Sequence, residues 1–149
     1  MKQLTKWAAT VLIAAVTLIS QSALAEQFVV HGDYEIHYNA FNSTFVQPNV
    51  AKNLDIQRSK RRAFLNVSVL KMEGDKKVPV SALVSGEASN LAGQVQKMSF
   101  KKIDEGDAIY YLGQFGFTNR QVFRITFDVQ PDPNNPAFTI KFEQQFYED

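Results

Sequence analysis

Both histidines of the chain lie in one short segment that also holds two carboxylates. His31, Asp33, Glu35 and His37 follow one another at every second position, so in one extended strand all four side chains point to the same face. Residues two apart in a strand lie about 6.8 Å apart, and His31 would lie about 20 Å from His37. One metal ion with ligands at about 2 Å cannot use all four. We therefore expect a solvated polar face, and Glu35 with His37 is a weak alternative metal site that needs a further ligand from a neighbouring strand.

A basic cluster lies further along the chain. Arg58, Lys60, Arg61 and Arg62 place four positive charges within five residues. Guanidinium groups match the oxygens of phosphates and carboxylates, so the cluster suits a phosphate, a lipid A headgroup or an acidic protein patch. A charge run is more often a solvated surface, and that alternative stays open. The cluster is nevertheless the best binding surface that the sequence offers.

An aromatic and amide-rich stretch directly follows His37. Tyr38 and Asn42 are the residues in it that we expect to line a pocket or a peptide groove. The alternative is that the aromatic side chains of this stretch fill one end of a hydrophobic core.

Catalysis finds little support in the sequence. The chain has no cysteine, and a serine nucleophile would have to recruit one of the two histidines without a nucleophile elbow. The segment Gly113-Gln114-Phe115-Gly116 lacks the lysine of a phosphate-binding loop. We therefore expect a protein that is not an enzyme and has no cofactor.

The first 25 residues have the pattern of a cleaved signal peptide. Lys2 and Lys6 precede an apolar run over residues 7–19, and Ala23-Leu24-Ala25 is the small-x-small pattern of a cleavage site. The apolar run is too short for a membrane-spanning helix, which needs about 20 residues. We expect cleavage after Ala25, a periplasmic location, and one domain over residues 26–149 without a transmembrane segment.

The charge of this expected domain does not favour nucleic acid. Removing Lys2 and Lys6 from the 16 basic residues leaves 14 against 15 acidic ones. A net charge close to zero gives no general attraction to a polyanion. Positive charge is therefore local, in the cluster around Arg61.

Alternation of apolar and polar residues predicts strands along most of the domain. A proline-rich loop over residues 131–136 separates two such strands and predicts a hairpin. Residues 63–70 are apolar on one face and partly apolar on the other, which suits a central strand. Residues 94–103 carry three lysines and are typical of an edge strand. Only Pro48–Leu54 suits a short helical turn. The sequence thus predicts an all-β, immunoglobulin-like sandwich of about seven to eight antiparallel strands.

Two segments resemble a known family. The segments His37-Tyr38-Asn39-Ala40-Phe41-Asn42-Ser43-Thr44-Phe45 and Arg58-Ser59-Lys60-Arg61-Arg62-Ala63-Phe64-Leu65-Asn66-Val67-Ser68-Val69 are similar to those of an uncharacterised family of secreted proteobacterial proteins, domain-of-unknown-function family 4426. The resemblance covers the whole domain. It implies a periplasmic location and an immunoglobulin-like sandwich, and it implies neither an activity nor catalytic residues.

The function expected from the sequence is a non-enzymatic periplasmic binding or accessory module. Its partner would be an envelope protein or an anionic envelope component, held by the basic cluster or by an exposed edge strand, for which residues 94–103 are the expected site. A small outer-membrane β-barrel is one alternative, because alternating strands suit both architectures. A hydrolase or a carrier of a small ligand is a weaker one. The sequence leaves the oligomeric state open.

Overall fold

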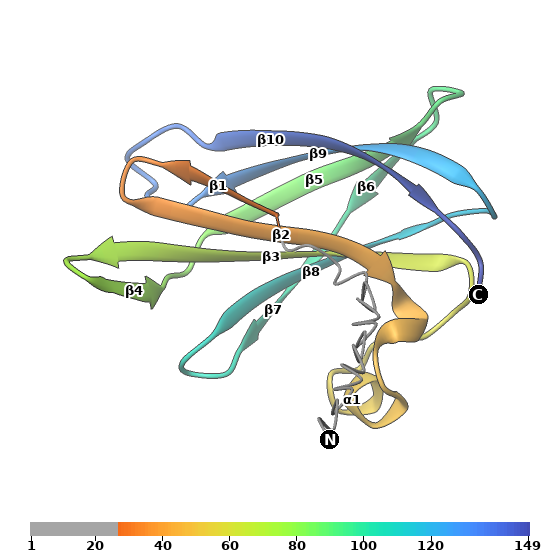
Figure 1. Ribbon diagram of the computed structural model, residues 1–149, viewed down its shortest axis with the longest axis horizontal. Helices are drawn as coiled ribbons and strands as arrows, with labels where there is room; N and C mark the ends of the chain where they lie inside the picture. Colours follow the sequence, from red (N-terminus) through yellow and green to blue (C-terminus); the bar gives the residue numbers. More distant parts are fainter. Residues whose placement is uncertain (1–26) are drawn as a thin grey trace, which may run out of the picture.

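The computed structural model describes residues 27–149, so the expected signal peptide and its cleavage site lie outside the described residues. This part of the chain folds into ten strands in two antiparallel sheets that pack face to face (Figure 1). The predicted β-sandwich is confirmed, with more strands than expected, because residues 76–90 and residues 95–104 each form two strands.

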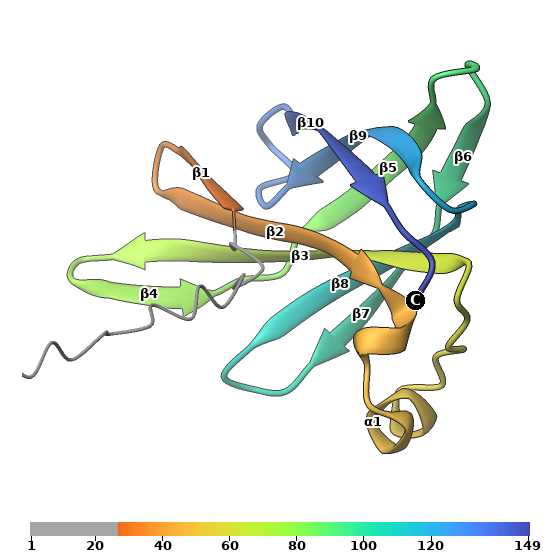
Figure 2. The same cartoon turned by 45° about the vertical axis from the view of Figure 1, so that its right-hand side comes forward.

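The two sheets differ in size and do not close on one another (Figure 2). The first sheet has the order β1 (Gln27–His31), β2 (Tyr34–Asn42), β3 (Arg62–Glu73), β8 (Ile109–Gly116) and β7 (Phe100–Asp104), and β4 (Lys76–Pro79) pairs with the last residues of β3. The second sheet has the order β10 (Phe138–Phe146), β9 (Gln121–Gln130), β5 (Leu83–Asn90) and β6 (Val95–Met98).

The core lies between the sheets and is built by side chains at every second position. From the first sheet, Leu65, Val67 and Val69 are fully buried, and from the second sheet Ile125, Phe127 and Val129 are fully buried. The residues between them face outward, because successive side chains of a strand point to opposite faces. The predicted β9–β10 hairpin is confirmed and joins Phe138 to Val129.

The predicted edge strand over residues 94–103 is divided between the two sheets. Met98 is the last residue of β6, at one edge of the second sheet, and Phe100 is the first residue of β7, at one edge of the first sheet. The chain changes sheets at Ser99. Met98 is buried and Phe100 packs against the core, so the apolar side chains on either side of Ser99 hold both strands to the same core.

A helical segment connects β2 to β3 at one end of the first sheet (Figures 1 and 2). It consists of a 3-10 turn, η1 (Ser43–Phe45), and the predicted helical turn, α1 (Pro48–Asn53). The buried hydroxyl of Ser43 donates to the carbonyl of Ser59 and accepts from its N–H, both at 2.8 Å. These two bonds hold the following loop, residues 54–61, against the end of the sheet.

Gly86 provides a test of how tightly β5 is packed between β6 and β9. An alanine Cβ at this position would lie 2.8 Å from Cβ of Phe127 and 2.9 Å from the carbonyl oxygen of Thr126. We expect Gly86→Ala to lower the free energy of unfolding by about 2 kcal/mol, because both contacts involve groups that cannot move aside easily. Urea unfolding of purified protein measures the loss.

The matched control is Gly116→Ala, at the end of β8. A Cβ there would meet its nearest atoms at 3.7 Å and 3.8 Å, which is ordinary contact. The control should unfold at the same urea concentration as the original chain, and equal midpoints for both variants would contradict the packing described for β5.

Candidate functional site

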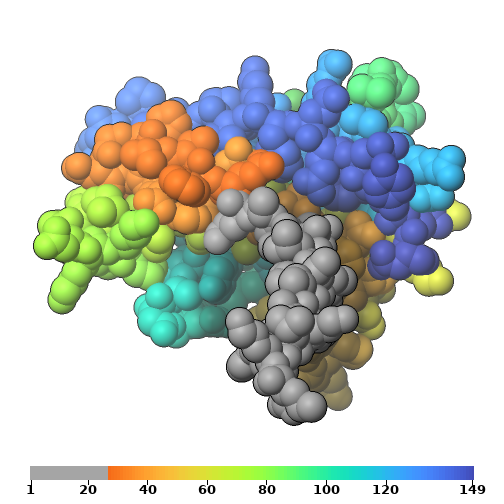
Figure 3. Space-filling model, in the orientation of Figure 1, coloured from red at the N-terminus to blue at the C-terminus, as the bar shows by residue number. Residues whose placement is uncertain are grey.

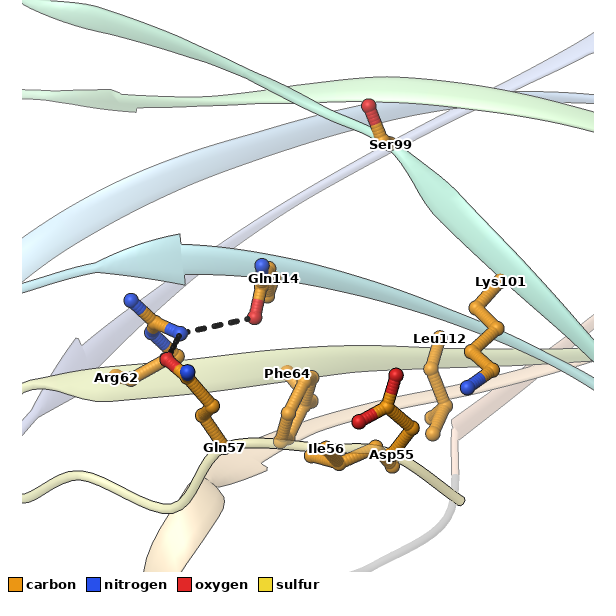
Figure 4. A pocket seen from close by; sticks show the side chains of 9 residues that line it. All are labelled: Asp55, Ile56, Gln57, Arg62, Phe64, Ser99, Lys101, Leu112 and Gln114. Atoms are coloured by element: carbon orange, nitrogen blue, oxygen red, sulfur yellow. Dashed lines mark hydrogen bonds between the residues drawn. The ribbon is translucent and has the colours of Figure 1, made fainter. Parts of the chain in front are cut away.

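Arg62 lies at the start of β3 and is the centre of the basic cluster. Its Nη1 atom donates to the side-chain oxygen of Gln57 at 3.2 Å and to that of Gln114 at 3.4 Å (Figure 4). Within residues 27–149, no carboxylate pairs with this guanidinium. Both of its partners are neutral amides, so the positive charge of Arg62 is positioned without being neutralised.

Two hollows meet at Arg62 and Gln114. One has a volume of about 290 Å³ and is bounded by the loop after α1 and by β7 and β8, as Figure 4 shows; it is lined by Asp55, Ile56, Gln57, Arg62, Phe64, Ser99, Lys101, Leu112 and Gln114. The other has a volume of about 430 Å³ and is lined by Ser59, Arg61, Arg62, Gln96, Gln114, Phe115 and Gly116. We call them the first and second arginine pockets.

Backbone pairing fixes the walls of both pockets. The N–H of Phe117 donates to the carbonyl of Arg61 at 2.9 Å, which extends the pairing of β3 with β8. The side-chain amide of Gln96 donates to the carbonyl of Gly116 at 2.8 Å and accepts from its N–H at 2.9 Å. Gln96 therefore ties β6 to the end of β8 and holds one side of the second pocket in place.

The charges in the two pockets are unequal. The first pocket contains Lys101 and Asp55 as well as Arg62, and the ammonium group of Lys101 donates to the carbonyl of Leu54. The second pocket contains two arginines and no carboxylate. An anion is therefore favoured most on the Arg61 side of Arg62 once Arg61 is released from the carboxylate of Glu148, with which it pairs at 3.0 Å.

Only Arg61 and Arg62 of the basic cluster line the arginine pockets. Arg58 turns away and donates to the carbonyl of Thr44 at 3.0 Å, and Lys60 is exposed and lines neither pocket. Arg61 pairs with Glu148 at 3.0 Å, and its side chain is 71% exposed. The side chain of Glu148 is 27% exposed, so water reaches this pair mainly from the arginine side. Ion pairs that water reaches contribute about 0–1 kcal/mol, and Arg61 can exchange Glu148 for another anion at little cost.

Tyr38 and Asn42 do not line the arginine pockets. Tyr38 is buried in the core, with ring centroids 5.3 Å from Phe127 and 5.1 Å from Phe142. For Tyr38 this is the core-filling alternative, whereas Asn42 lines a separate hollow of about 200 Å³ together with Phe41 and Phe45. Asn42 donates to the carbonyl of Tyr147 at 2.6 Å and to the carboxylate of Asp149 at 3.2 Å, which attaches the end of the chain to β2.

His31, Asp33, Glu35 and His37 do not share one face of a single strand. Gly32, with a φ of 56°, begins a turn that separates β1 from β2. His31 stands opposite Tyr34 and stacks on the ring of Phe138 at 4.5 Å, whereas Glu35 and His37 lie on the outward face of β2. The expectation of one solvated face was wrong because a hairpin turn reverses the chain inside the segment.

Glu35 is buried, although we expected it to be solvated. Its carboxylate contacts Nε2 of His37 at 2.5 Å and the ammonium group of Lys77 at 3.1 Å, and the Glu35 side chain is only 9% exposed. These partners lower the pKa of the carboxyl group, the hydrogen bond from Lys77 most strongly, against the opposing effect of burial. Among the residues described, no group of three or more histidine, cysteine, aspartate or glutamate side chains is placed to hold a metal ion.

No sequence pattern predicted the three glutamines of the site, which are Gln57, Gln96 and Gln114. Gln114 lies 52 residues from Arg62, and Gln57 and Gln96 lie in polar segments that do not distinguish them from their neighbours. No local pattern marks an amide that becomes a partner of an arginine, because the pairing of β3 with β8 positions Gln114 and the fold of the loop after α1 positions Gln57. The basic cluster was the only sequence signal that pointed to this end of the fold.

The fold and this site define a small antiparallel β-sandwich protein with a polar, arginine-centred surface at one end. No helix within residues 27–149 is both long and apolar enough to span a membrane. The chain belongs to the family called domain of unknown function DUF4426, whose family model matches residues 28–149. The resemblance seen in the sequence is thereby confirmed. None of the curated proteins matches the chain.

Solved structures share the fold. A DUF4426 family protein from Pseudomonas aeruginosa PAO1 is 40% identical, with a TM-score of 0.71 over 83% of this chain and 96% of that protein. FetP from uropathogenic Escherichia coli strain F11, as isolated after recombinant expression in the periplasm, is 14% identical, with a TM-score of 0.55 over 83% of this chain and 94% of FetP. A copper-bound FetP variant is also 14% identical, with a TM-score of 0.56, and the match covers 83% of this chain and 91% of the variant. The likeness to FetP establishes a common fold.

The buried carboxylate predicts a dependence of stability on pH. Because the native chain keeps Glu35 charged to a lower pH than the unfolded chain does, its contribution is complete above the ordinary pKa of glutamate and is lost as the pH falls through the lowered native value. We expect Glu35→Gln to cost about 1–2 kcal/mol of unfolding free energy at neutral pH, and this difference should disappear in acid. Urea unfolding at a series of pH values measures it.

The matched control is Glu143→Gln, which removes an exposed carboxylate that pairs with Arg124 at 3.2 Å. Its stability should differ little from that of the original chain at every pH, since exposed ion pairs contribute little. A difference for Glu35→Gln that persists unchanged in acid would show that the carboxylate is not held in its charged form by Lys77 and His37.

Proposed function

We propose that the chain is exported to the periplasm, is cleaved after Ala25, and acts there as a non-enzymatic binding module. The charged start, the apolar run and the Ala23-Leu24-Ala25 pattern support export. The fold shared with FetP, which was expressed in the periplasm, agrees with this location.

Expression of the full-length sequence in a Gram-negative host tests the export proposal. We expect soluble protein in the periplasmic fraction, with Glu26 as its first residue by mass spectrometry of the intact chain. Ala25→Arg should block cleavage, because signal peptidase requires a small residue at that position. Protein that keeps residues 1–25 and stays in the cytoplasm would refute the proposal.

We further propose that the module binds a phosphate-bearing component of the envelope at the arginine pockets. The observation that carries this is the guanidinium of Arg62, which two neutral amides hold between two hollows without a carboxylate partner. A guanidinium offers paired donors to phosphate oxygens, and glutamine side chains at the same place offer further N–H groups.

The shape of the site favours a compact anion over an acidic protein surface. The pockets have volumes of about 290 Å³ and 430 Å³, and such hollows accept a small group, whereas a protein partner needs a larger and flatter area. The exposed pair of Arg61 with Glu148 can open to supply a second guanidinium. Local positive charge on a nearly neutral domain further predicts binding that weakens with salt.

The copper bound to the FetP variant does not change this proposal. Glu35 and His37 supply one carboxylate and one imidazole, whereas protein metal sites commonly use three or more ligands. The ammonium group of Lys77 also occupies the carboxylate of Glu35. We therefore base the proposed function on Arg61 and Arg62.

Titration with pyrophosphate, followed by amide NMR, tests the phosphate proposal. We expect shifts at the backbone of Gly116 and at the side-chain amides of Gln96 and Gln114. Arg62→Gln should weaken binding at least about 10-fold, because one hydrogen-bonded charge contributes about 1.5–3 kcal/mol.

Arg124→Gln is the matched control. It removes the same charge from an exposed position on β9, and it should leave binding unchanged. Equal affinities of the Arg62→Gln and Arg124→Gln variants would show that pyrophosphate responds only to the overall charge of the domain. The absence of any shift at the pocket amides would refute the proposed site.

A further inference from the structure

The sheet edges of this fold are not equally protected. Within residues 27–149, five strands lie at an edge: β1, β4, β6, β7 and β10. Four of them carry charged side chains or proline, namely β4 with Lys76, Lys77 and Pro79, β6 with Lys97, β7 with Lys101, Lys102 and Asp104, and β10 with Lys141 and Glu143. Charges and proline on an edge strand prevent other strands from adding to it.

β1 lacks this protection. Its sequence, Gln27-Phe28-Val29-Val30-His31, contains no lysine, arginine, carboxylate or proline. Phe28 is 57% exposed and Val30 is 60% exposed, both on the outward face of the first sheet. Among the described strands, β1 pairs only with β2, so its second edge presents backbone N–H and carbonyl groups beside two large apolar side chains.

β1 is also held rigidly enough to act as a template. Val29 packs against the core, and His31 stacks on Phe138 of β10 at 4.5 Å with nearly parallel rings. In Figure 3 the orange atoms of β1 and β2 lie at the surface, below the blue atoms of β10. A strand that already has its native conformation adds a partner at a lower entropic cost.

We propose that the exposed edge of β1 binds β1 of a second copy of this chain, in antiparallel orientation, with Val29 on the two-fold axis. The sequence of β1 is complementary to itself in this register. Phe28 of each copy stands opposite Val30 of the other, and Gln27 stands opposite His31. Two apolar pairs therefore form on the outward face, and no like charges meet across the junction.

This pairing joins the first sheets of two copies into one continuous sheet. The two-fold symmetry makes the contact closed, because each copy uses the one edge within residues 27–149 that lacks charges and proline. A five-residue strand buries less surface than a standard stable interface of about 800 Å² per partner. The dimer is therefore weak, and the fraction of chains that dimerise rises with the protein concentration.

Cysteine cross-linking tests the register, because the chain contains no cysteine of its own. Phe28→Cys and Val30→Cys proteins are purified separately, mixed and oxidised. We expect the mixture to form the Phe28→Cys with Val30→Cys disulfide faster than either protein forms a disulfide with itself. A mixture of Leu83→Cys and Leu91→Cys proteins, also substituted at exposed apolar positions, serves as the control and should show no preference.

Sedimentation equilibrium of the periplasmic protein tests the dimer itself. The original chain should dimerise as its concentration rises toward millimolar, and Val30→Lys should remain monomeric with an unchanged melting temperature, because Val30 is exposed. Leu83→Lys, 71% exposed in the original chain, should dimerise like the original. A monomeric original chain at millimolar concentration, or equal dimerisation of Val30→Lys, would refute the proposal. β1 lines neither arginine pocket, so this result is independent of phosphate binding.

Discussion

Face-to-face packing of two apolar sheet faces is the constraint on which the rest of this structure depends. The chain has no cysteine, so no disulfide limits the unfolded state, and folding relies on burial of side chains such as Leu65, Phe127 and Val129. Burial also fixes the register of every strand, since a shift by one residue would turn the apolar set toward water. Gly86 shows how close this packing is, because β9 leaves no space for a methyl group on β5.

The same register decides what the outward face presents. With Ala63 and Leu65 facing the core, Arg62 must face away from it. The pairing of β3 with β8 places Gln114 on the same face, and the loop after α1 brings Gln57 to the other side of the guanidinium. The arginine pockets are therefore a consequence of sheet register and of the loop that Ser43 attaches to the sheet.

Two charged side chains on the outward face of the first sheet, Glu35 and Arg62, have different surroundings. Glu35 is buried on the outward face and is satisfied by Lys77 and His37, which is what a buried carboxylate requires. Arg62 instead remains accessible with neutral partners only. The contacts of Glu35 stabilise the sheet, whereas the contacts of Arg62 leave its charge available to a ligand. β1, at the edge of the same sheet, carries no carboxylate, lysine or arginine and presents apolar side chains instead.

The sequence by itself determined the fold class, the family, the β9–β10 hairpin, the helical turn at Pro48 and the presence of a basic cluster. These features follow from local patterns, because alternation, proline and turn residues act over a few positions. Only the tertiary structure decided that Arg58 turns away, that Gln114 meets Arg62 across 52 residues, and that residues 95–104 serve both sheets. It also divided His31 from His37 by a turn and buried Glu35. The contact of Gln114 with Arg62, the division of residues 95–104 and the burial of Glu35 depend on which strands become neighbours, and burial of the whole core makes that choice rather than any short segment. The turn at Gly32 is a local feature, and the direction of Arg58 depends on the fold of the connection between β2 and β3.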